Sequence, residues 1–395
     1  MANDWNAQTS DPKARKLMQG FPPEPGLIVR PDEVGLPGNT FPNTRWSFSH
    51  QREMKATVNI RRGGSSTYVF PRKLRSEIDG IAFTTQEGQL LTWAQSLDAL
   101  FTDGIVVLHR GTIVYETFRG ALEPHLPHIA FSVTKSFVGV IAAMLAHEGA
   151  LDQGALVTRY VPELAGTAYG DATVRQVMDM TIGVQYVENY TDPLAEVRTY
   201  GIAAGYSPAP PGYAGPDTIF DFLRTLKKQG EHGQAFAYKT CNTEVLSWIV
   251  QRITGTPTAQ LISERIWQKL GVEEDAYIIV DRIGAAACGG GMNLCLRDLA
   301  RFGEMLRLGG VFNGHEIVPE EVVDGIANGG DREHFARAGY TTVPGWSYRN
   351  QFWVSHDKFG AYTARGIHGQ VCWIAPKADL VIARFASHPV AANGN

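Results

Sequence analysis

The stretch His128-Ile-Ala-Phe-Ser-Val-Thr-Lys-Ser-Phe-Val-Gly-Val-Ile-Ala-Ala-Met-Leu145 places a serine and a lysine three residues apart at the start of an apolar run. On a helix, positions i and i+3 are neighbours with Cβ atoms about 5–6 Å apart, so Ser132 and Lys135 would share one face. The lysine amine could then take the proton of the hydroxyl, and the N–H groups of the first turn would favour the negative charge that develops. The spacing predicts a serine nucleophile with a lysine base.

Two other places in the chain match the same Ser-x-x-Lys spacing and serve as internal comparisons. Ser10-Asp-Pro-Lys13 encloses a proline, and Ser355-His-Asp-Lys358 is not followed by a helical apolar run. After Lys135, by contrast, apolar residues cover most of the predicted helix, and burial there would lower the pKa of the lysine toward neutrality. From the local sequence alone, a catalytic Ser132 and a plain helix start with a solvated lysine are equal alternatives.

The composition indicates a globular protein of enzyme size. The chain has 395 residues, of which 44% are hydrophobic and 19% charged, enough for one complex domain or two. A formal net charge of −4 without a long basic run argues against nucleic acids and acidic membrane surfaces as partners. No stretch reaches about 18 apolar residues and the first residues form no apolar signal, so a cytoplasmic location is the default expectation. The four cysteines are sparse, which is typical of buried thiols rather than disulfides.

The order of predicted elements indicates a discontinuous α/β fold. Residues 1–90 are rich in Pro, Gly, Asn and Arg and are interpreted as an irregular segment that wraps over the main body. The sequence does not indicate its role. Residues 91–150 and 275–395 would form the α/β domain, and residues 151–274 an all-helical lobe, with a cleft between them. The predicted helices are 92–101, 174–180, 218–227, 242–253 (capped by Asn242), 258–270 and 296–308. The predicted strands are a hairpin over 105–118 turned at Arg110-Gly111, a strand over 351–355, and a hairpin of 371–374 with 380–385 across Pro376-Lys377.

A serine–lysine pair also needs a group that carries the proton to the leaving atom, and donors for the oxyanion. Tyr238, just before the helix predicted from Asn242, is the best candidate for the proton carrier. A tyrosine beside an ammonium group is expected to have its pKa lowered from about 10, so that its phenol could accept and return a proton near neutral pH.

Taken together, several segments resemble the serine β-lactamase and penicillin-binding superfamily, in its esterase and amidase branch, and most closely the 6-aminohexanoate-dimer (nylon-oligomer) hydrolases. Ser-x-x-Lys is one of the signatures of β-lactamases. The resembling segments are Ser132-Val-Thr-Lys-Ser136, Tyr160-Val-Pro-Glu-Leu-Ala-Gly166, Val174-Arg-Gln-Val-Met-Asp-Met180, Phe236-Ala-Tyr238 with Asn242, Ile266-Trp-Gln-Lys-Leu-Gly271, Arg297-Asp-Leu-Ala-Arg-Phe-Gly303 and Gly366-Ile-His-Gly-Gln370. The resemblance implies an antiparallel sheet flanked by helices, with an inserted helical lobe.

The resemblance also implies roles for individual residues. Ser132 would be the nucleophile, Lys135 its base and Tyr238 the proton carrier, while the backbone N–H groups of Ser132 and Ile367 would hold the oxyanion. The residues implied as substrate-binding are Tyr190, Trp353, His368 and Gly201. Trp353 could instead belong to the core and Tyr190 to a surface loop.

At Gly201, efficient amidases of the nylon-oligomer branch can carry an acidic side chain suited to a substrate ammonium. This chain has no side chain there, so esters are expected to be favoured over amino-terminated amides. In an alternative interpretation, Gly201 serves only a turn, and the carboxylate of Glu188, Asp192 or Glu196 reaches the ammonium.

The chain also departs from the family pattern. Where penicillin-recognising members have Lys-Thr-Gly, the corresponding place reads His368-Gly-Gln370, which argues against antibiotic hydrolysis. The family's Tyr-x-Asn becomes Tyr238-Lys-Thr240, with an asparagine only at position 242. Members normally end in a long helix packed on the sheet, so the stop at Asn395 suggests a lost or truncated tail.

Other motifs carry less weight. His125 and His128 could form a metal pair, but no third ligand is apparent and Pro127 breaks a regular helix, so no metal is expected. Gly289-Gly-Gly291 is better interpreted as a tight turn near the cleft than as a nucleotide site.

The sequence therefore predicts a cofactor-free serine hydrolase that cleaves small esters or linear amides through an acyl group on Ser132. The alternatives are a β-lactamase or D-amino-acid peptidase of the same fold, and a catalytically silent acyl-binding module. The oligomeric state is open, with a homodimer among the options.

Overall fold

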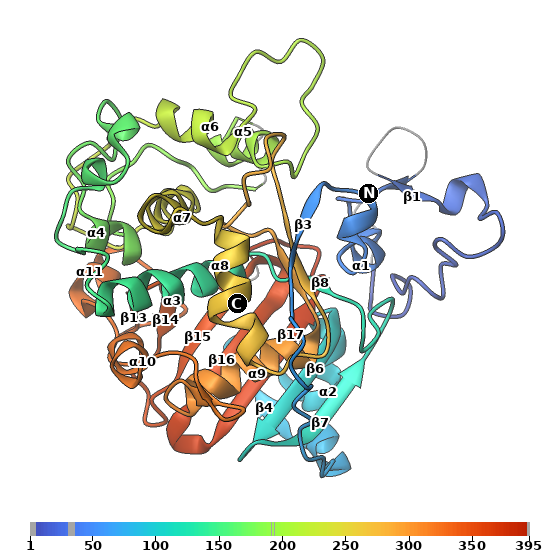
Figure 1. Ribbon diagram of the computed structural model, residues 1–395. Helices are drawn as coiled ribbons and strands as arrows, with labels where there is room; N and C mark the ends of the chain where they lie inside the picture. The colour runs from blue at the N-terminus through green and yellow to red at the C-terminus, as the bar shows by residue number, and fades with distance from the viewer. Residues whose placement is uncertain (1–4, 31–35, 191, 193, 393–395) are drawn as a thin grey trace.

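The structure is a computed structural model that describes residues 5–30, 36–190, 192 and 194–392. Its main element is a seven-stranded sheet in which every neighbouring pair is antiparallel (Figure 1). The strands follow in the order β13 (Ser347–Arg349), β14 (Phe352–Val354), β15 (Tyr362–Gly366), β16 (Gln370–Ala375), β17 (Leu380–Ala386), β6 (Thr102–His109) and β7 (Thr112–Phe118). The predicted antiparallel sheet is confirmed, and so are both predicted hairpins, β6–β7 and β16–β17.

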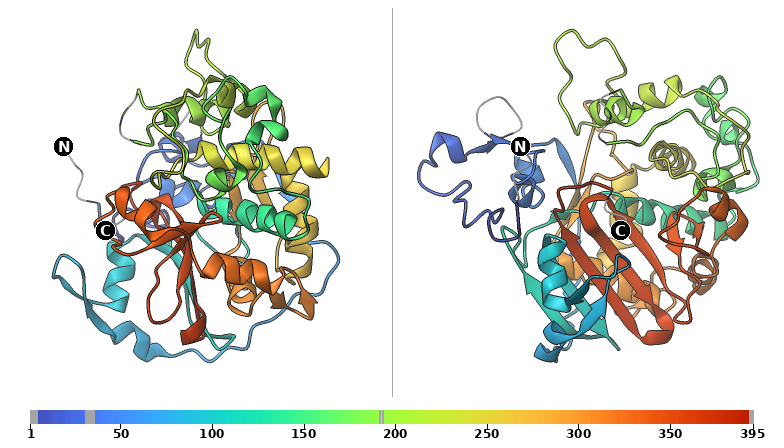
Figure 2. Two further views of the ribbon diagram at one scale, coloured as in Figure 1. Left: turned by 90° about the vertical axis from the view of Figure 1, so that its left-hand side faces the viewer. Right: turned by 180° about the vertical axis from the view of Figure 1, so that it is seen from behind.

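Both faces of the central strands are covered by other elements. Successive side chains of a strand point to opposite sides of the sheet, so they pack alternately on the two coverings. Val106 and Leu108 of β6 belong to the main core on the side of helix α9 (Leu296–Arg307), which packs on β6, β16 and β17. Ile105 and Val107 of the same strand instead pack with Leu97 of helix α2 (Trp93–Ala99). Viewed from behind, α2 lies over this second face (Figure 2, right). A strand buried on both faces is expected to read as a continuous apolar run, as β6 does.

Helix α3 (Val133–His147) carries the Ser-x-x-Lys stretch into the middle of the molecule. It packs against helices α7 (Cys241–Thr254) and α8 (Thr258–Arg265) on one side and against β15 and β16 on the other. Every residue from Val133 to Leu145 is buried. A helix that is apolar on nearly all sides has to be covered on all sides. Helices α7 and α8 and strands β15 and β16 therefore pack around α3.

Between residues 151 and 274 the described elements are helices and short 3-10 turns, which gather on the side of α3 away from the sheet (Figure 1). Besides α7 and α8 these helices are α4 (Val174–Met178), α5 (Glu196–Ala203) and α6 (Ile219–Thr225). The predicted helices are found within a few residues of their expected ends, except that the one expected over 258–270 stops at Arg265 and continues as a 3-10 turn, Trp267–Lys269. Helix α5 was not predicted. The division into domains at 90, 150 and 274 stays a prediction.

The predicted cap of α7 is wrong. The helix begins one residue before Asn242, with Thr240 at the capping position, and ends at Gly255 in the left-handed conformation as expected. Asn242 is buried inside the first turn, where its side-chain oxygen accepts a hydrogen bond from the Tyr169 hydroxyl at 2.8 Å. Its polar group therefore serves a tertiary contact rather than the helix end.

The first 90 residues are less irregular than expected. Strand β3 (Thr57–Ile60) is the edge of a second antiparallel sheet, with β9 (Ala276–Ile279), β10 (Met292–Leu294) and β8 (His128–Ile129). Shorter elements are α1 (Thr44–Ser47) and the paired strands β1 (Val29–Arg30) with β2 (Leu36–Pro37) and β4 (Ala82–Thr84) with β5 (Leu90–Thr92). The pairing partners of β3 lie more than 200 positions away, so local sequence could not reveal them.

Buried polar contacts fasten this first segment to the main sheet. The Arg45 guanidinium pairs with the Asp103 carboxylate of β6 at 3.1 Å, and Ser387 donates to the same carboxylate at 2.5 Å. Because neither Arg45 nor Asp103 reaches solvent, each charge depends on the other. The N-terminal segment is thus held at a fixed place beside β8 and the start of α3.

Further short elements complete the described fold. They are helices α10 (Glu320–Ala327) and α11 (Arg332–Arg337) and the short hairpin of β11 (Val311–Phe312) with β12 (His315–Glu316). All four cysteines are buried, as expected. Within the described part of the chain, no helix combines the length and apolar character that crossing a bilayer requires.

Candidate active site

Ser132 lies at the capping position of α3, directly after a strained residue. Phe131 has a φ of 44°, a left-handed conformation that is uncommon for a bulky side chain. Such strained residues concentrate at functional sites, where the surrounding structure holds them in place. The turn brings the Ser132 hydroxyl, on a residue only 8% exposed, to the wall of a cavity.

Lys135 meets Ser132 as the helical spacing predicts. Its Nζ lies 2.8 Å from Ser132 Oγ and also donates a hydrogen bond to the carbonyl of Gly289. Burial lowers the pKa of Lys135 to about 8, although the negative charges of Glu188 and Glu244 act in the opposite direction. The expected lowering is confirmed, and an appreciable fraction of the amine is neutral near pH 8. A solvated lysine is excluded, because Lys135 is 1% exposed.

The glycine turn at 289–291 lies at the site, as predicted. Glu244, buried on α7, accepts hydrogen bonds from the N–H of Gly289 at 2.7 Å and from the Tyr200 hydroxyl at 2.5 Å. Burial raises the pKa of this carboxyl to about 7. A Cβ at Gly289 would lie 2.4 Å from Thr240 and 2.7 Å from the Tyr200 hydroxyl, so only glycine fits. Glu244 thereby holds the carbonyl that accepts the hydrogen bond from Lys135.

Tyr238 lies beside the pair, but its predicted pKa is wrong. Lys135 Nζ is 5.2 Å from the centre of the Tyr238 ring, over its face rather than beside its oxygen. Burial raises the pKa of Tyr238 well above its ordinary value, and a hydrogen bond with Ser132 only partly opposes this. The aromatic side chains that enclose it include Trp353, stacked on its ring at 5.5 Å, and Tyr348. Tyr238 is therefore a neutral phenol at rest, which can accept a proton only while giving up its own.

The backbone of β15 approaches the start of α3 unusually closely. A Cβ at Gly366 would lie 2.6 Å from the carbonyl oxygen of Ala130 and 3.1 Å from the nitrogen of Ser132. Glycine is therefore required at this place. The close approach brings Ile367 to the same cavity wall as Ser132, where the two N–H groups were predicted to hold an oxyanion. Among the described residues, no acceptor takes the N–H of Ser132.

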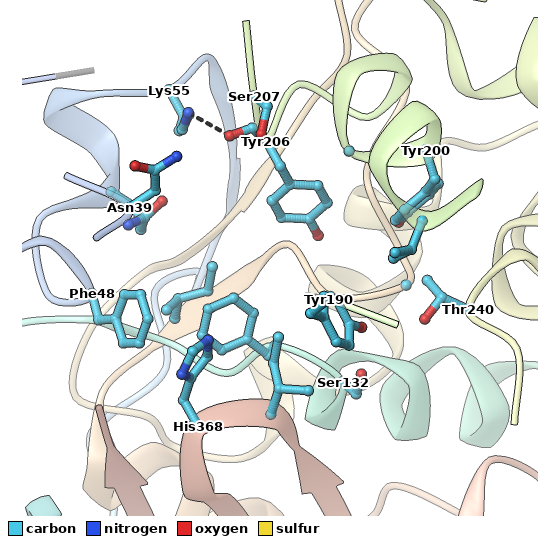
Figure 3. Close-up of a pocket in the computed structure, with 18 of the residues that line it drawn as sticks. Asn39, Phe48, Lys55, Ser132, Tyr190, Tyr200, Tyr206, Ser207, Thr240 and His368 are labelled. Carbon is cyan, nitrogen blue, oxygen red and sulfur yellow. Dashed lines mark hydrogen bonds between the residues drawn. The ribbon is translucent and has the colours of Figure 1, made fainter. Parts of the chain in front are cut away.

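Two cavities meet at Ser132. The first, of about 250 Å³, lies between the N-terminal segment, α5 and the end of β15 (Figure 3). Its walls include Asn39, Phe48, Tyr190, Tyr200, Tyr206 and Thr240. The second, of about 310 Å³, lies on the side of β14 and β15, and its walls include Glu188, Tyr238, Tyr340, Trp353 and Arg365. Ser132, Tyr190 and Ile367 line both cavities, so a bound carbonyl could extend to either side.

The structure brings the four predicted substrate-binding residues to these cavities. Tyr190 lines both, Trp353 the second, and His368 and Gly201 the first. Gly201 lies inside α5 and not in a turn, so the turn interpretation is wrong. Of the three alternative carboxylates, that of Glu188 lines a cavity, where it accepts hydrogen bonds from Tyr190 and Thr240.

His368 cannot supply a positive charge to the first cavity at neutral pH. It has a φ of 62° just after β15, its Nδ1–H donates to the carbonyl of His388 at 2.6 Å, and its ring packs against Phe48 and Phe131. Burial lowers its pKa to about 4. A different basic residue, Arg365, lies near the end of β15 and lines the second cavity. Arg365 was not singled out from the sequence.

The sequence also gave no indication that the N-terminal segment reaches the site. Asn39, Phe48 and Lys55 line the first cavity, and Lys55 Nζ donates to the carbonyl of Tyr206 at 2.7 Å (Figure 3). No local motif marks these residues, because their place depends on contacts with β8 and α5. Glu244 carried no signal that set it apart, because an acidic residue in the first turn of a helix is common and is favoured by the helix dipole.

The histidines considered for metal binding lie apart from the site. His128 is buried, with Nε2 3.4 Å from the Asp103 carboxylate, whereas His125 is exposed. Within the described residues, no group of three histidine, cysteine, aspartate or glutamate side chains is arranged to hold a metal ion.

The sequence and the fold were each found to be similar to those of known proteins. The family model described as Beta-lactamase matches residues 93–393. The 6-aminohexanoate-dimer hydrolase of Paenarthrobacter ureafaciens is 36% identical over 88% of this chain and 86% of its own length. A solved structure from Bacillus anthracis, assigned to the same activity, is 33% identical and covers 90% of this chain and 91% of its own, with a TM-score of 0.82. A D-stereospecific amidohydrolase from Streptomyces shares the fold at 16% identity and a TM-score of 0.55, over 73% of this chain and 91% of its own.

Proposed function

The chain is an enzyme of the β-lactamase family, and from this premise we propose that it hydrolyses small carboxylic esters and linear amides through an acyl group on Ser132. The observation that carries the proposal is the buried pair of Ser132 Oγ and Lys135 Nζ, 2.8 Å apart, at the junction of the two cavities. A hydroxyl next to an amine that is partly neutral at its working pH is an activated nucleophile.

In the first half of the reaction, the Lys135 amine takes the Ser132 proton while Oγ bonds to the substrate carbonyl carbon. The N–H groups of Ser132 and Ile367 stabilise the oxyanion that forms. Collapse of this intermediate breaks the bond to the leaving oxygen or nitrogen, which receives a proton from the Tyr238 hydroxyl. The proton that Lys135 took from Ser132 restores the Tyr238 hydroxyl, since a neutral phenol must regain the proton that it gives up.

In the second half, water attacks the acyl group on Ser132. The same residues act in reverse, so the water proton passes to the Lys135–Tyr238 pair and then to Ser132 Oγ as the acid leaves. None of these steps needs a cofactor.

A substrate panel tests the proposal. We expect the purified protein to hydrolyse 4-nitrophenyl esters of short acids, and to cleave the linear 6-aminohexanoate dimer more slowly. A cephalosporin should be a poor substrate, because His368 stays neutral. Efficient cephalosporin turnover with no ester hydrolysis would support the β-lactamase alternative. Inactivity on all three substrates, together with no acylation of Ser132, would support a silent acyl-binding module.

Position 201 is expected to control the choice between ester and amide. A Cβ at Gly201 would meet only Ser207 Oγ within 4 Å, at 3.9 Å, so a side chain fits inside the first cavity without strain. In Gly201→Asp, a charge-assisted hydrogen bond to a substrate ammonium contributes about 1.5–3 kcal/mol, or roughly 10- to 150-fold. We expect kcat/KM for the amino-terminated dimer to rise by that factor, while the value for a neutral ester stays nearly unchanged.

Gly201→Asn is the matched control, because it has the size of aspartate without the charge. Equal changes with both substrates, or an asparagine variant as effective as the aspartate, would exclude Gly201 as the charge determinant. Efficient dimer cleavage by the unaltered protein would exclude it as well.

The cellular setting is also a proposal. The four buried thiols support a reducing compartment such as the cytoplasm. A small ester or amide is the expected partner, and a homodimer is the oligomeric state to test by light scattering.

A further inference from the structure

Lys55 brings a positive charge from the N-terminal segment to the wall of the first cavity. It lies just before strand β3, where its own N–H donates to the Gln51 carbonyl at 2.9 Å and the next carbonyl, of Ala56, accepts from Val280 at 3.0 Å. The side chain is held as well, because Nζ donates to the Tyr206 carbonyl at 2.7 Å. The fold therefore fixes the ammonium group at the cavity wall.

The Lys55 ammonium has donors left for a ligand. An ammonium carries several N–H donors, and the Tyr206 carbonyl takes one of them. Among the residues that the structure describes, Lys55 forms no ion pair, and the neighbouring Glu53 carboxylate lies 4.0 Å from Arg30 instead. Burial lowers the pKa of Lys55, so the charged form has lost part of its hydration without gaining a counter-ion. A ligand anion at this place would restore what burial has removed.

The other walls of the first cavity add no negative charge. Within the described part of the chain, neither an aspartate nor a glutamate lines this cavity. Arg198 of α5 lines it and donates to a backbone carbonyl, while the His368 ring is neutral. The Glu244 carboxyl is engaged behind the glycine turn by the N–H of Gly289 and by a tyrosine hydroxyl. The cavity therefore favours an anionic ligand over a cationic one.

Lys55 lies across the first cavity from the nucleophile. Figure 3 shows Lys55 on one side of this cavity and Ser132 on the other. The walls also include the apolar side chains of Phe48, Met54 and Val197, which suit a hydrocarbon chain. A ligand with a reacting carbonyl at one end and a carboxylate at the other would match both ends of the cavity and the apolar walls.

Tyr238 indicates which part of the substrate enters the first cavity. It lines the second cavity and is not among the described walls of the first. In the proposed reaction the leaving atom receives its proton from Tyr238, so the leaving group lies toward the second cavity and the acyl group in the first. We propose that Lys55 binds a carboxylate at the far end of the acyl group, and that the enzyme therefore prefers half-esters and half-amides of linear dicarboxylic acids. This inference rests on the proposed function and adds the charge of the acyl group to it.

Three chromogenic esters test the inference. All of them release 4-nitrophenol, and their acyl groups are hexanoyl, adipoyl with a free carboxylate, and 6-aminohexanoyl with a free ammonium. The acyl chains have the same number of carbons, so they differ mainly in the charge at the far end. Because the leaving group is shared, differences in kcat/KM report how the acyl group is bound up to and including acylation.

We expect the unaltered protein to prefer the adipoyl ester to the 6-aminohexanoyl ester by about tenfold or more in kcat/KM. Lys55→Met removes the charge but keeps a side chain of similar length. It should lower kcat/KM for the adipoyl ester by about 10- to 100-fold and change the hexanoyl ester by less than about threefold. Lys55→Arg should keep most of the preference, and Lys55→Glu should reverse the order of the two charged esters.

Lys73→Met is the matched control. Lys73 also belongs to the N-terminal segment and makes the same change in net charge, but it is exposed and lines neither cavity. Its replacement should leave kcat/KM for all three esters unchanged.

Each other outcome has a definite meaning. Equal losses on all three esters in Lys55→Met would overturn the inference and make Lys55 a support for the loop at Tyr206. An unchanged adipoyl rate in that variant, or a preference of the unaltered protein for the 6-aminohexanoyl ester, would overturn it too. If the unaltered protein cleaves none of the esters, the proposed function itself fails and this inference fails with it. Normal cleavage of the hexanoyl ester by Lys55→Met shows that the variant is folded.

Discussion

Ser132→Ala is expected to lower kcat for ester hydrolysis by about 10⁴- to 10⁶-fold, the range known for loss of a serine nucleophile. The reason is that no other group can form the acyl-enzyme at the junction of the cavities. Removing Oγ leaves only the Lys135 hydrogen bond to Gly289. The fold should persist, since the change deletes one atom at a cavity wall. A fluorophosphonate probe followed by peptide mass spectrometry should place a single adduct on Ser132 in the unaltered protein.

The other two Ser-x-x-Lys serines provide matched controls. Ser10 Oγ donates to the Asn6 carbonyl at 2.6 Å and accepts a hydrogen bond from Arg45 at 3.1 Å. Ser355 Oγ donates to the Ala361 carbonyl at 2.8 Å, so both hydroxyls are engaged away from the cavities. Ser10→Ala and Ser355→Ala should retain activity and labelling. An adduct on either serine, or full activity in Ser132→Ala, would contradict the assignment of the nucleophile.

Lys135 and Tyr238 are expected to behave as one unit in a double-mutant cycle. Lys135→Met removes the base while filling the buried space, and Tyr238→Phe removes the hydroxyl while keeping the stack on Trp353. Each should lower kcat by roughly 10³-fold or more, and the double variant should be only slightly worse than the poorer single one. Because the pKa of Tyr238 is raised by burial, neither residue can pass the proton on without the other.

Tyr340→Phe is the control for this cycle. Tyr340 lines the second cavity and packs 5.5 Å from Trp353, so its loss of a hydroxyl tests the aromatic wall without the relay. It should stay within a few-fold of the unaltered enzyme. Single variants that each lose less than tenfold, and whose losses multiply in the double variant, would show that the two residues do not share a proton.

Features that depend on neighbouring residues could be predicted from the sequence. The pairing of Ser132 with Lys135 follows from helical spacing, and the depressed pKa of Lys135 follows from the apolar run after it. The two hairpins follow from β-branched runs with turn residues between them. Resemblance to a known family added Tyr190 and Trp353, which line the second cavity together with Tyr238.

Features that depend on distant residues could not be predicted. The pKa of Tyr238 was expected to fall and instead rises, because Trp353 and Tyr348, more than 100 positions away, enclose its ring and Lys135 lies over the ring face. The place of Arg365 over the Trp353 ring follows only from the register of β14 and β15. The sequence by itself determined which side chains can react, since that depends on covalent structure and helical periodicity. Tertiary structure alone decided which of them are desolvated and which cavity each of them lines, because burial and the local electric field are set by every element packed around the site.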